Sequence, residues 1–509
     1  MLDLTSNGSS VHPERTRERT MNMRWIHAAA FALLLASAAF AAQPSVPEKF
    51  TDDATPDFEP TVFRLRDLSD TWGTVTVSIR HFGSLDVRNY VVSKVGTTFT
   101  RGYLPTPIDK PHSYDPYLYA SQYGTGTAAY RLYCVGIVGD LTKGVEHNSI
   151  TVWRSDNHGR DQFRTLPYQI VDSGTGAGTI SNPDGTYEKR VVDKPTIAVN
   201  GYLPSRGYVY VAYMRNTTVY NSATNAKIKE YQSVYAARST DGGNTWQTPQ
   251  LVYSNENGTG KINSAHIVAA NGTGYLYIAW VRYQGWSGGI MLARSPSSGT
   301  VTGSWVLDTT GPTGYMQTGG ESTKSNDMVR QTLVIMRHNA VANKLIMVWN
   351  EPDGSSPSAT HDVYYAEKGT GGWSVWNGVK KLKVSSDRPP CGTTETATDQ
   401  VRPTLDYDGS GKITIAYYDR QQDCANDLYN VWFAQLTTGS TTPAVVAQVP
   451  IPFADLNGSS SSDLDANGER IGDYFDLWCD TATCYTAWIG TPRNASGTPQ
   501  GDLLVTTIQ

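Results

Sequence analysis

Short runs of alternating apolar and polar residues recur along this chain, which is the pattern of strands with buried faces. In four places the run starts on Tyr or Lys and ends on Ala or Val followed by an aromatic residue. These four segments, spaced 67 to 69 residues apart, cover 208–213, 275–280, 344–349 and 412–417. Degraded copies begin at Tyr130 and Thr483. The recurrence predicts one structural unit repeated six times.

A further strand follows four of these segments, at 234–239, 290–295, 363–366 and 431–434. These strands are rich in β-branched and aromatic residues and are bounded by Gly, Asn and Ser. Six units at a near-constant period predict an all-β fold, a six-bladed β-propeller. The period exceeds the roughly 40 to 50 residues of compact blades. We therefore expect long loops, where binding and catalytic residues commonly lie.

The composition agrees with an all-β protein. The chain has 30 Tyr and 47 Gly in 509 residues, only 17% of its residues are charged, and it shows no sustained helical periodicity beyond the N-terminus. The net charge of −5 disfavours nucleic acid as a partner. We expect a single propeller domain over residues 43–509 and a monomer.

Residues 1–42 are interpreted as a leader followed by a secretory signal peptide. Arg24 precedes an apolar run at 28–36, and small residues suited to cleavage end at Ala41 and Ala42. The run is too short to span a membrane, so we predict a secreted or periplasmic protein.

The two ends of the chain are expected to close the ring together. Only three strands fit in the last repeat, near 473–478, 484–489 and 503–508. A strand from residues 61–95 is expected to complete it, with the N-terminal segment to about residue 110 closing the ring.

Five cysteines fit an oxidising compartment. Cys479 and Cys484 flank a short turn between two strands and are expected to form a disulfide. Cys391 and Cys424 lie in long loops on either side of one hairpin and could pair. Cys134 lies in an apolar strand and is expected to be a buried free thiol.

One turn has a specific pattern: residues 239–246 read Ser-Thr-Asp-Gly-Gly-Asn-Thr-Trp. Ser239 and Asp241 can bond to the turn backbone, Gly243 tolerates positive φ, and Trp246 can bury its ring beneath the turn. The turn should join the third strand of a blade to the fourth. Because strands alternate in direction, it then lies opposite the end where first strands begin, and we interpret it as structural.

The other end of the ring should gather the residues before each first strand and after each second strand. Five of these positions carry Arg, which binds carboxylates bidentately and suits an acidic ligand. The Asp residues at these positions either bind ligand or tie neighbouring blades, and Arg–Asp pairing is the alternative for the arginines. The candidates are Arg215, Arg282, Arg330, Arg402, Arg420, His266, Asp115, Asp193, Asp327 and Asp399.

The turn at 239–246 fits the Asp box of sialidase-type propellers. With the six-unit period and the secretion signal, the chain resembles the sialidase (neuraminidase) superfamily over roughly residues 110–509. The nearest string to that family's Phe-Arg-Ile-Pro signature is Phe63-Arg64-Leu65-Arg66, which lacks the Pro.

The resemblance implies a Tyr nucleophile assisted by a Glu, an Asp as acid/base, and Arg residues that hold the substrate carboxylate. Tyr474 matches the nucleophile by its place in the last repeat, and Glu351 is the candidate partner because it replaces the Arg found at this place in other blades. Arg330 and Arg402 match the carboxylate-binding positions, and Asp193 is the candidate acid/base. The resemblance thus implies a glycoside hydrolase that acts on an acidic or decorated glycan.

Two other functions stay open. A polysaccharide lyase acting on a uronate would use the arginines to neutralise the acid and a Tyr or His, such as His266, as base. A propeller that only binds glycans or proteins would need no catalytic group.

No cofactor is expected. Asp463, Asp465 and Asn467 fit the first half of a calcium loop, but Tyr474 stands where the bidentate Glu is expected. An Asx-rich turn and a structural calcium site are the two interpretations.

Overall fold

The computed structural model describes a single compact unit within residues 43–509. The described ranges are 44–45, 48–50, 57–66, 72–83, 86–122, 130–157, 159–174, 179–200, 207–256, 260–270, 273–284, 287–308, 313–315, 332–352, 360–370, 382–385, 399–419, 430–436, 445–450, 475–490 and 502–508.

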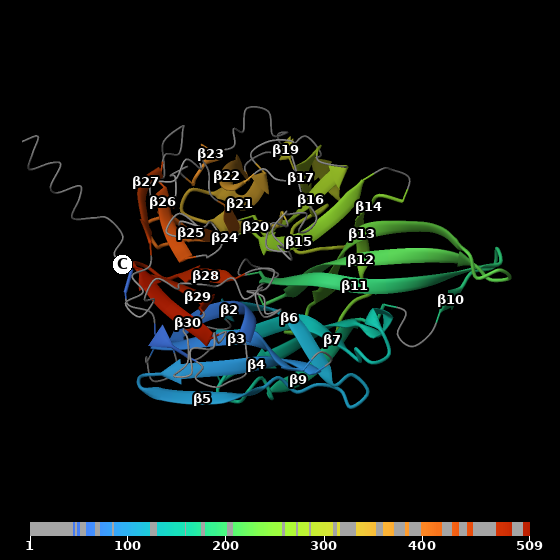
Figure 1. The fold of residues 1–509 in the computed structure, drawn as a ribbon, viewed down its shortest axis with the longest axis horizontal. Helices are drawn as coiled ribbons and strands as arrows, with labels where there is room; N and C mark the ends of the chain where they lie inside the picture. Colours follow the sequence, from blue (N-terminus) through green and yellow to red (C-terminus); the bar gives the residue numbers. More distant parts are fainter. Residues whose placement is uncertain are drawn as a thin grey trace, which may run out of the picture. The chain divides into compact units, whose positions relative to one another are not determined.

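The described residues form seven antiparallel sheets, so the fold is an all-β, seven-bladed β-propeller (Figure 1). Blade 1 contains β2 (Asp57–Arg66), β3 (Trp72–Gly83), β4 (Asp86–Val95) and β5 (Thr98–Tyr103). Blade 2 contains β6 (His112–Gln122), β7 (Tyr130–Gly139), β8 (Ser149–Ser155) and β9 (Leu166–Asp172), with the short 3-10 helix η1 (Val145–His147) between β7 and β8. Blade 3 contains β10 (Ile180–Ser181), β11 (Thr186–Val199), β12 (Val209–Asn221), β13 (Lys227–Ser239) and β14 (Gln250–Ser254).

Blade 4 contains β15 (Lys261–Ala269), β16 (Leu276–Gln284), β17 (Ser287–Arg294), β18 (Val306–Asp308) and β19 (Thr313–Tyr315). Blade 5 contains β20 (Val334–Asn339), β21 (Lys344–Pro352), β22 (His361–Gly369) and β23 (Leu382–Lys383). Blade 6 contains β24 (Gln400–Tyr407), β25 (Ile413–Asp419), β26 (Asn430–Leu436) and β27 (Val445–Pro450). Blade 7 contains β28 (Asp476–Cys479), β29 (Cys484–Gly490), β30 (Asp502–Ile508) and, from the N-terminal side, β1 (Glu48–Lys49).

The prediction of six blades is wrong. Residues 57–103 form blade 1, a complete blade, instead of completing the last one. Its second strand carries Val75 and Val77 on one face and Thr76 and Ser78 on the other, all of them buried between neighbouring blades. This second strand lacks the Ala–aromatic ending of the repeated segment. The repeat in the sequence therefore does not reveal blade 1.

An N-terminal strand does complete the last blade, but it is β1 rather than a strand from 61–95. Glu48 pairs with Val505 and Lys49 with Leu504. The ladder is extended by Phe50, whose N–H donates to Leu503 O at 2.9 Å, and by Ser45, whose N–H donates to Thr507 O at 2.8 Å. Closure by a strand from the other end of the chain removes an open sheet edge.

The first strands of successive blades contact one another in cyclic order, from β2 through β6, β11, β15, β20, β24 and β28 back to β2. They run in the same direction around the axis, so they all begin at one end of the ring and finish at the other. The second and third strands follow outwards, where the repeated segments of the sequence lie. The turn at 239–246 joins β13 to β14, the third and fourth strands of blade 3, as predicted.

The core lies between adjacent blades, whose two faces are both apolar. Trp280 of blade 4 packs with Ala212 and Met214 of blade 3, and Trp349 of blade 5 packs with Tyr277 of blade 4. Trp280 and Trp349 are fully buried, and burial of a large apolar side chain stabilises the fold by about 1.5 to 3 kcal/mol. Cys134 is a buried free thiol, as predicted.

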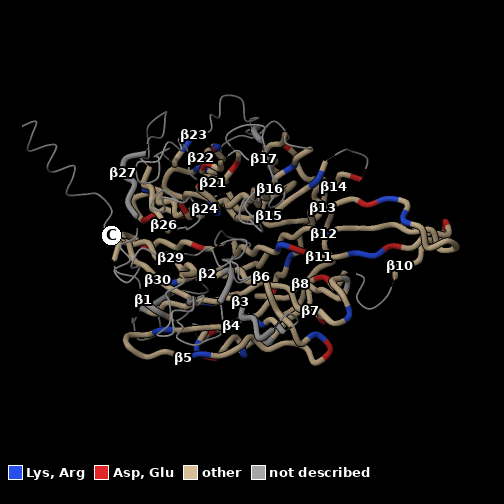
Figure 2. The backbone as a smooth tube through the Cα atoms, viewed as in Figure 1, with Lys and Arg blue, Asp and Glu red and all other residues tan. Residues whose placement is uncertain are grey.

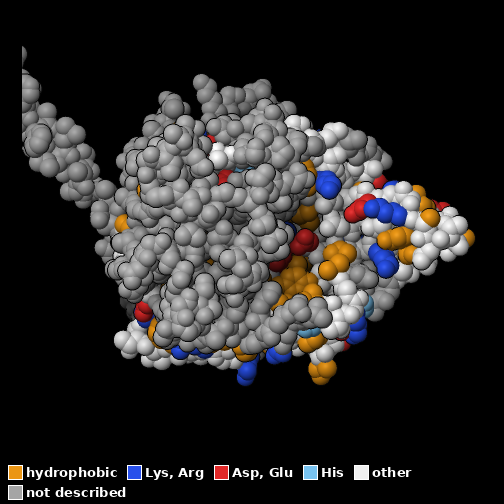
Figure 3. Space-filling view, in the orientation of Figure 1, with side chains coloured by type: hydrophobic (Ala, Val, Ile, Leu, Met, Phe, Trp, Pro, Cys, Tyr) orange, Lys and Arg blue, Asp and Glu red, His pale blue; other side chains and the backbone are white. Residues whose placement is uncertain are grey.

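Blade 3 is longer than the others because β11, β12 and β13 extend beyond the ring as an arm, to the right in Figure 1. Lys and Arg alternate with Asp and Glu along the arm (Figure 2), and hydrophobic side chains lie beside them on its surface (Figure 3). No helix among the described residues is long and apolar enough to cross a membrane.

Candidate functional site

The strand-start end of the ring, where the first strands begin, is built on β-bulges. Among the described residues, the ladder shifts register near the start of β2, β6, β15 and β24 and, in the longer strand β11, between Asp193 and Thr196. In four of these bulges one residue has a left-handed backbone, with φ of 50° at Asp115, 49° at Lys194, 54° at Ser264 and 51° at Arg402. The left-handed conformation thus recurs at four equivalent positions, although each carries a different residue type. The bulges therefore place four different polar side chains near one end of the ring.

A left-handed backbone costs a non-glycine residue about 1 to 3 kcal/mol, and it persists where neighbouring structure compensates. At the blade 3 bulge, the residue two positions after Lys194 bonds to the next blade. Thr196 Oγ1 donates to Ala265 O at 2.8 Å and accepts from Ile267 N at 3.0 Å. Thr61 Oγ1 accepts from Leu118 N at 3.1 Å in the same way. These inter-blade hydrogen bonds hold the bulges in place.

Two of the aspartates at the strand-start end tie neighbouring blades together. Asp115 of blade 2 pairs with Lys194 of blade 3, with 3.7 Å between Oδ2 and Nζ. Asp399, before β24, accepts a hydrogen bond from His361 N of blade 5 at 3.0 Å. For these two residues the structural interpretation is supported.

Arg215 is committed to the fold. Its guanidinium forms an ion pair with Asp172 of blade 2 and lies 3.8 Å from the centre of the Tyr235 ring. Tyr213 Oη donates to the same Asp172 carboxylate at 2.5 Å. Burial and this carboxylate raise the pKa of Tyr213, which therefore stays a neutral donor. Arg215 is a brace between blades rather than a free ligand for a substrate acid.

The other described candidates lie at separate places around the ring. Glu351, near the end of β21, is 1% exposed and accepts a hydrogen bond from Trp349 Nε1 at 2.9 Å. Asp193 is half-buried beside the blade 3 bulge and accepts from Lys194 N at 2.9 Å. Arg282 is half-buried on the second strand of blade 4, and Arg402 is buried in its bulge. The remaining candidates lie outside the described residues: Tyr474, Arg330, Arg420, Asp327, Asp463, Asp465 and Asn467.

His266 lies inside the ring, in a cluster that joins distant blades. Arg337 of β20 donates through Nη1 to Tyr117 Oη of β6, and Tyr117 Oη lies 2.8 Å from His266 Nε2 of β15. Burial and the facing guanidinium lower the pKa of His266 well below its ordinary value. The imidazole of His266 is therefore neutral, and its Nε2 accepts a hydrogen bond from the Tyr117 hydroxyl group. His266 Nδ1 is buried with no hydrogen-bond partner among the described residues.

Asp476 completes this cluster from blade 7. Its Oδ1 accepts from Arg337 Nη2 at 3.0 Å, and its Oδ2 accepts from Thr61 Oγ1 of blade 1 at 2.9 Å. Asp476 is 3% exposed. Thus the Arg337 guanidinium neutralises a carboxylate buried near the axis, and five blades are linked through this cluster.

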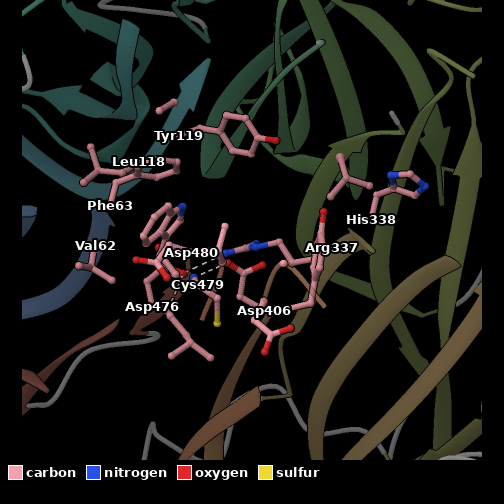
Figure 4. Close-up of a pocket in the computed structure, with 18 of the residues that line it drawn as sticks. Val62, Phe63, Leu118, Tyr119, Arg337, His338, Asp406, Asp476, Cys479 and Asp480 are labelled. Atoms are coloured by element: carbon pink, nitrogen blue, oxygen red, sulfur yellow. Dashed lines mark hydrogen bonds and ion pairs between the residues drawn. The ribbon is translucent and has the colours of Figure 1, made fainter. Parts of the chain in front are cut away.

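A cavity of about 430 Å³ opens beside this cluster, at the end of the ring where the first strands finish (Figure 4). We call it the strand-end cavity. It is lined by Val62, Phe63, Leu118, Tyr119, Ala120, Val268, Ala269, Arg337, His338, Asp406, Tyr407, Asp408, Gly409, Asp476, Leu477, Trp478, Cys479, Asp480 and Thr481. Figure 4 shows the Arg337 side chain reaching toward Asp476.

Asp406 is the most perturbed carboxylate of this cavity. It is 8% exposed, and its Oδ2 accepts from Cys479 N at 2.8 Å. Burial raises the pKa of Asp406 to about 6, although Arg337 opposes the shift. Burial also raises the pKa of Asp476. Among the described residues, no group of three His, Cys, Asp or Glu could hold a metal ion.

Sequence reasoning missed Arg337 and Asp406 because it looked at strand starts. Both stand near the end of a first strand that is otherwise largely buried. A charged residue inside such a strand is a usable signal, because burying it requires a partner elsewhere in the fold.

No family model matches the chain, and no curated protein matches it. Solved structures align with it at low similarity. The NanB sialidase from Streptococcus pneumoniae matches with 9% identity and a TM-score of 0.38, over 91% of this chain and 70% of that one. The polysaccharide lyase Uly1 matches with 9% identity and a TM-score of 0.43, over 90% and 91%. The Trypanosoma rangeli sialidase matches with 12% identity and a TM-score of 0.35, over 77% and 58%. The activity of this chain must therefore be inferred from its own residues.

Proposed function

We propose that this chain is a secreted sialidase-like glycoside hydrolase that acts on an acidic glycan at the strand-start end of the ring. The observation that carries the proposal is the set of bulges, which hold different polar side chains in one recurring conformation. Bulges commonly re-aim side chains next to active sites. Lys194 and Arg402 give this set two cations, which suit a ligand carboxylate.

Tyr474 is the proposed nucleophile. It lies two residues before Asp476, and the chain that follows it is firmly anchored. Phe475 is 2% exposed, with its ring 4.7 Å from that of Tyr418, and Asp476 is bound to Thr61 and Arg337. A phenol assisted by a carboxylate can attack a cationic anomeric carbon without the repulsion that two anions would feel.

The remaining roles follow from position. Glu351 is the proposed carboxylate partner of the nucleophile, and its hydrogen bond to Trp349 would fix its orientation. Asp193 is the proposed acid/base, while Arg330 and Arg402 would hold the substrate acid. Arg215 is left out of this set because Asp172 already uses its guanidinium.

Incubation with a panel of sialylated, uronate-containing and neutral glycans tests the proposal. Hydrolysis releases a new reducing sugar or free sialic acid. Tyr474→Phe should lower kcat by roughly three orders of magnitude without moving the Tm. Tyr220→Phe, on the arm of blade 3, is the matched control and should keep full activity. Full activity of Tyr474→Phe would contradict the proposed mechanism, and binding without any product would indicate a purely binding propeller.

A polysaccharide lyase is a second candidate because of one observation, the neutral His266 beside the Tyr117 hydroxyl. Such a pair can exchange a proton during β-elimination, in which a base removes the proton next to the uronate carboxyl group. The glycan panel separates the two candidates, since a lyase yields an unsaturated uronate that absorbs in the ultraviolet. His266→Gln should abolish that product if the lyase mechanism operates.

A further inference from the structure

The strand-end cavity is distinct from the site of the proposed function. Most of its lining residues come from the later parts of the first strands and the turns that follow them, such as Tyr119 of β6, Arg337 of β20 and Asp406 of β24. The bulge with Arg402 lies near the start of β24, and the bulge with Lys194 lies in the part of β11 that follows the arm. Since the first strands run parallel around the axis, the two places lie toward opposite ends of the ring. The volume of about 430 Å³ falls within the roughly 300 to 1,000 Å³ of small-molecule sites.

Charge in the cavity favours a ligand without a negative charge. Among the described residues, the cavity is lined by the carboxylates of Asp406, Asp408, Asp476 and Asp480 and by one guanidinium, that of Arg337, which is bound to Asp476 and Tyr117. Burial lowers the pKa of His338, which therefore adds no positive charge near neutral pH. The polar lining is thus dominated by hydrogen-bond acceptors, which require a ligand rich in donors, such as hydroxyl groups.

One wall of the cavity is aromatic. The centre of the Phe63 ring lies 5.1 Å from that of Trp478 and 6.3 Å from that of Tyr119. These three residues come from blades 1, 7 and 2 and are only partly buried. The Phe63 ring is tilted by 44° against that of Trp478 and by 53° against that of Tyr119. The face of one such ring beside fixed polar acceptors suits the C–H face and the hydroxyl edge of a sugar ring.

The rim of the cavity is held rigidly. The disulfide Cys479–Cys484 closes the β28–β29 turn. Cys479 N donates to Asp406 of the neighbouring blade at 2.8 Å. Asp408 and Asp480 cap the turns of blades 6 and 7, because each accepts backbone hydrogen bonds from residues that follow it. A preformed site loses little entropy when a ligand binds.

We propose that the strand-end cavity is a second carbohydrate-binding site, which takes an uncharged pyranose unit between its aromatic wall and its carboxylates. The site needs none of the residues assigned to hydrolysis. A glycan bound there would keep the protein on its polymer, while acidic units are processed at the other end of the ring. The two proposals can therefore fail independently.

Saturation-transfer NMR with methyl glycosides of glucose, galactose and mannose tests this site, with methyl glucuronide as the charged counterpart. We expect binding of at least one neutral glycoside and none of the glucuronide in this cavity. Asp406→Asn should weaken the neutral ligand about tenfold, because a charged acceptor is replaced by an amide. Asp140→Asn, at a capping Asp of blade 2 outside the cavity, is the matched control and should bind normally.

Trp478→Ala tests the aromatic wall, and its Tm shows whether the blade has stayed folded. If that variant unfolds, Tyr119→Phe and Asp406→Asn still test the site. Arg402→Ala should leave neutral-sugar binding unchanged. Loss of binding in Arg402→Ala with retention in Asp406→Asn would overturn the proposal, as would the absence of binding by every neutral glycoside at tens of millimolar.

Discussion

The two ends of the ring differ in chemistry although the same strands build both. At the strand-start end, irregular bulges carry Lys194 and Arg402, and Asp115 is already paired with Lys194. At the strand-end cavity, Asp406 and Asp476 meet a single guanidinium, that of Arg337. We propose an acidic ligand for the first end and an uncharged ligand for the second.

The difference comes from how the chain turns at each end. In blades 6 and 7 the first strands are followed by short turns, in which Asp408 and Asp480 accept hydrogen bonds from backbone N–H groups. Short turns favour Asp for this reason. First strands begin after longer connections, where a bulge can carry any polar residue. The Asp residues of these turns thus make the strand-end side acidic, while the residue types at the strand-start end can vary.

The largest effect is expected at Asp476, because it balances the guanidinium of Arg337 in the strand-end cavity. Asp476→Ala should destabilise the protein by about 3 to 5 kcal/mol, since it leaves Arg337 buried without its partner. Chemical denaturation measures the loss. The double variant Asp476→Ala with Arg337→Met should recover part of it. A single variant with wild-type stability would show that this ion pair does not hold the cavity together.

The pH dependence of stability should differ between wild type and Asp406→Asn. Because the folded protein raises the pKa of Asp406 to about 6, its contribution to stability is complete below about pH 4 and is lost as the pH rises through 6. In Asp406→Asn, the free energy of unfolding should therefore fall by up to about 3 kcal/mol less between pH 4 and pH 7 than it does in the wild type. Denaturation curves at pH 4 and pH 7 check the difference, and identical slopes in the two proteins would contradict it.

The disulfide Cys479–Cys484 should contribute less to stability than the ion pair between Asp476 and Arg337. Replacing Cys479 and Cys484 by Ser should cost about 2 kcal/mol, because the bridge closes a very short loop. The Tm under non-reducing conditions measures this cost. We also expect weaker binding of neutral sugars, and unchanged binding would show that the rim is rigid without the bridge.

The smallest effect on stability is expected at the strand-start end. Lys194→Met should lower the free energy of unfolding by about 1 kcal/mol, because both side chains of its pair with Asp115 are largely buried but their charged atoms are 3.7 Å apart. Its KM for an acidic glycan should rise instead, and the rise should vanish on a neutral substrate. A large fall in Tm with an unchanged KM would make Lys194 a brace rather than a ligand-binding residue.

Local features were predictable from the sequence because they depend on residues a few positions apart. In the turn at 239–246, Ser239 Oγ accepts from Gly243 N at 2.8 Å, and Thr245 N donates to Asp241 at 2.9 Å, as expected. Gly243 has a φ of 90°. The disulfide Cys479–Cys484 was predictable for the same reason, since its cysteines face each other across one hairpin.

The sequence by itself determined the repeated hairpins, the β class and these short-range links, because alternation and turn chemistry act within a few residues. Tertiary structure alone decided the number of blades, since blade 1 is defined by burial between its neighbours and not by the repeated segment. It also decided which polar groups meet: Thr61 and Asp476 are 415 residues apart, yet they share a hydrogen bond near the axis. Such contacts arise only when the ring closes and buried charges from different blades must satisfy one another.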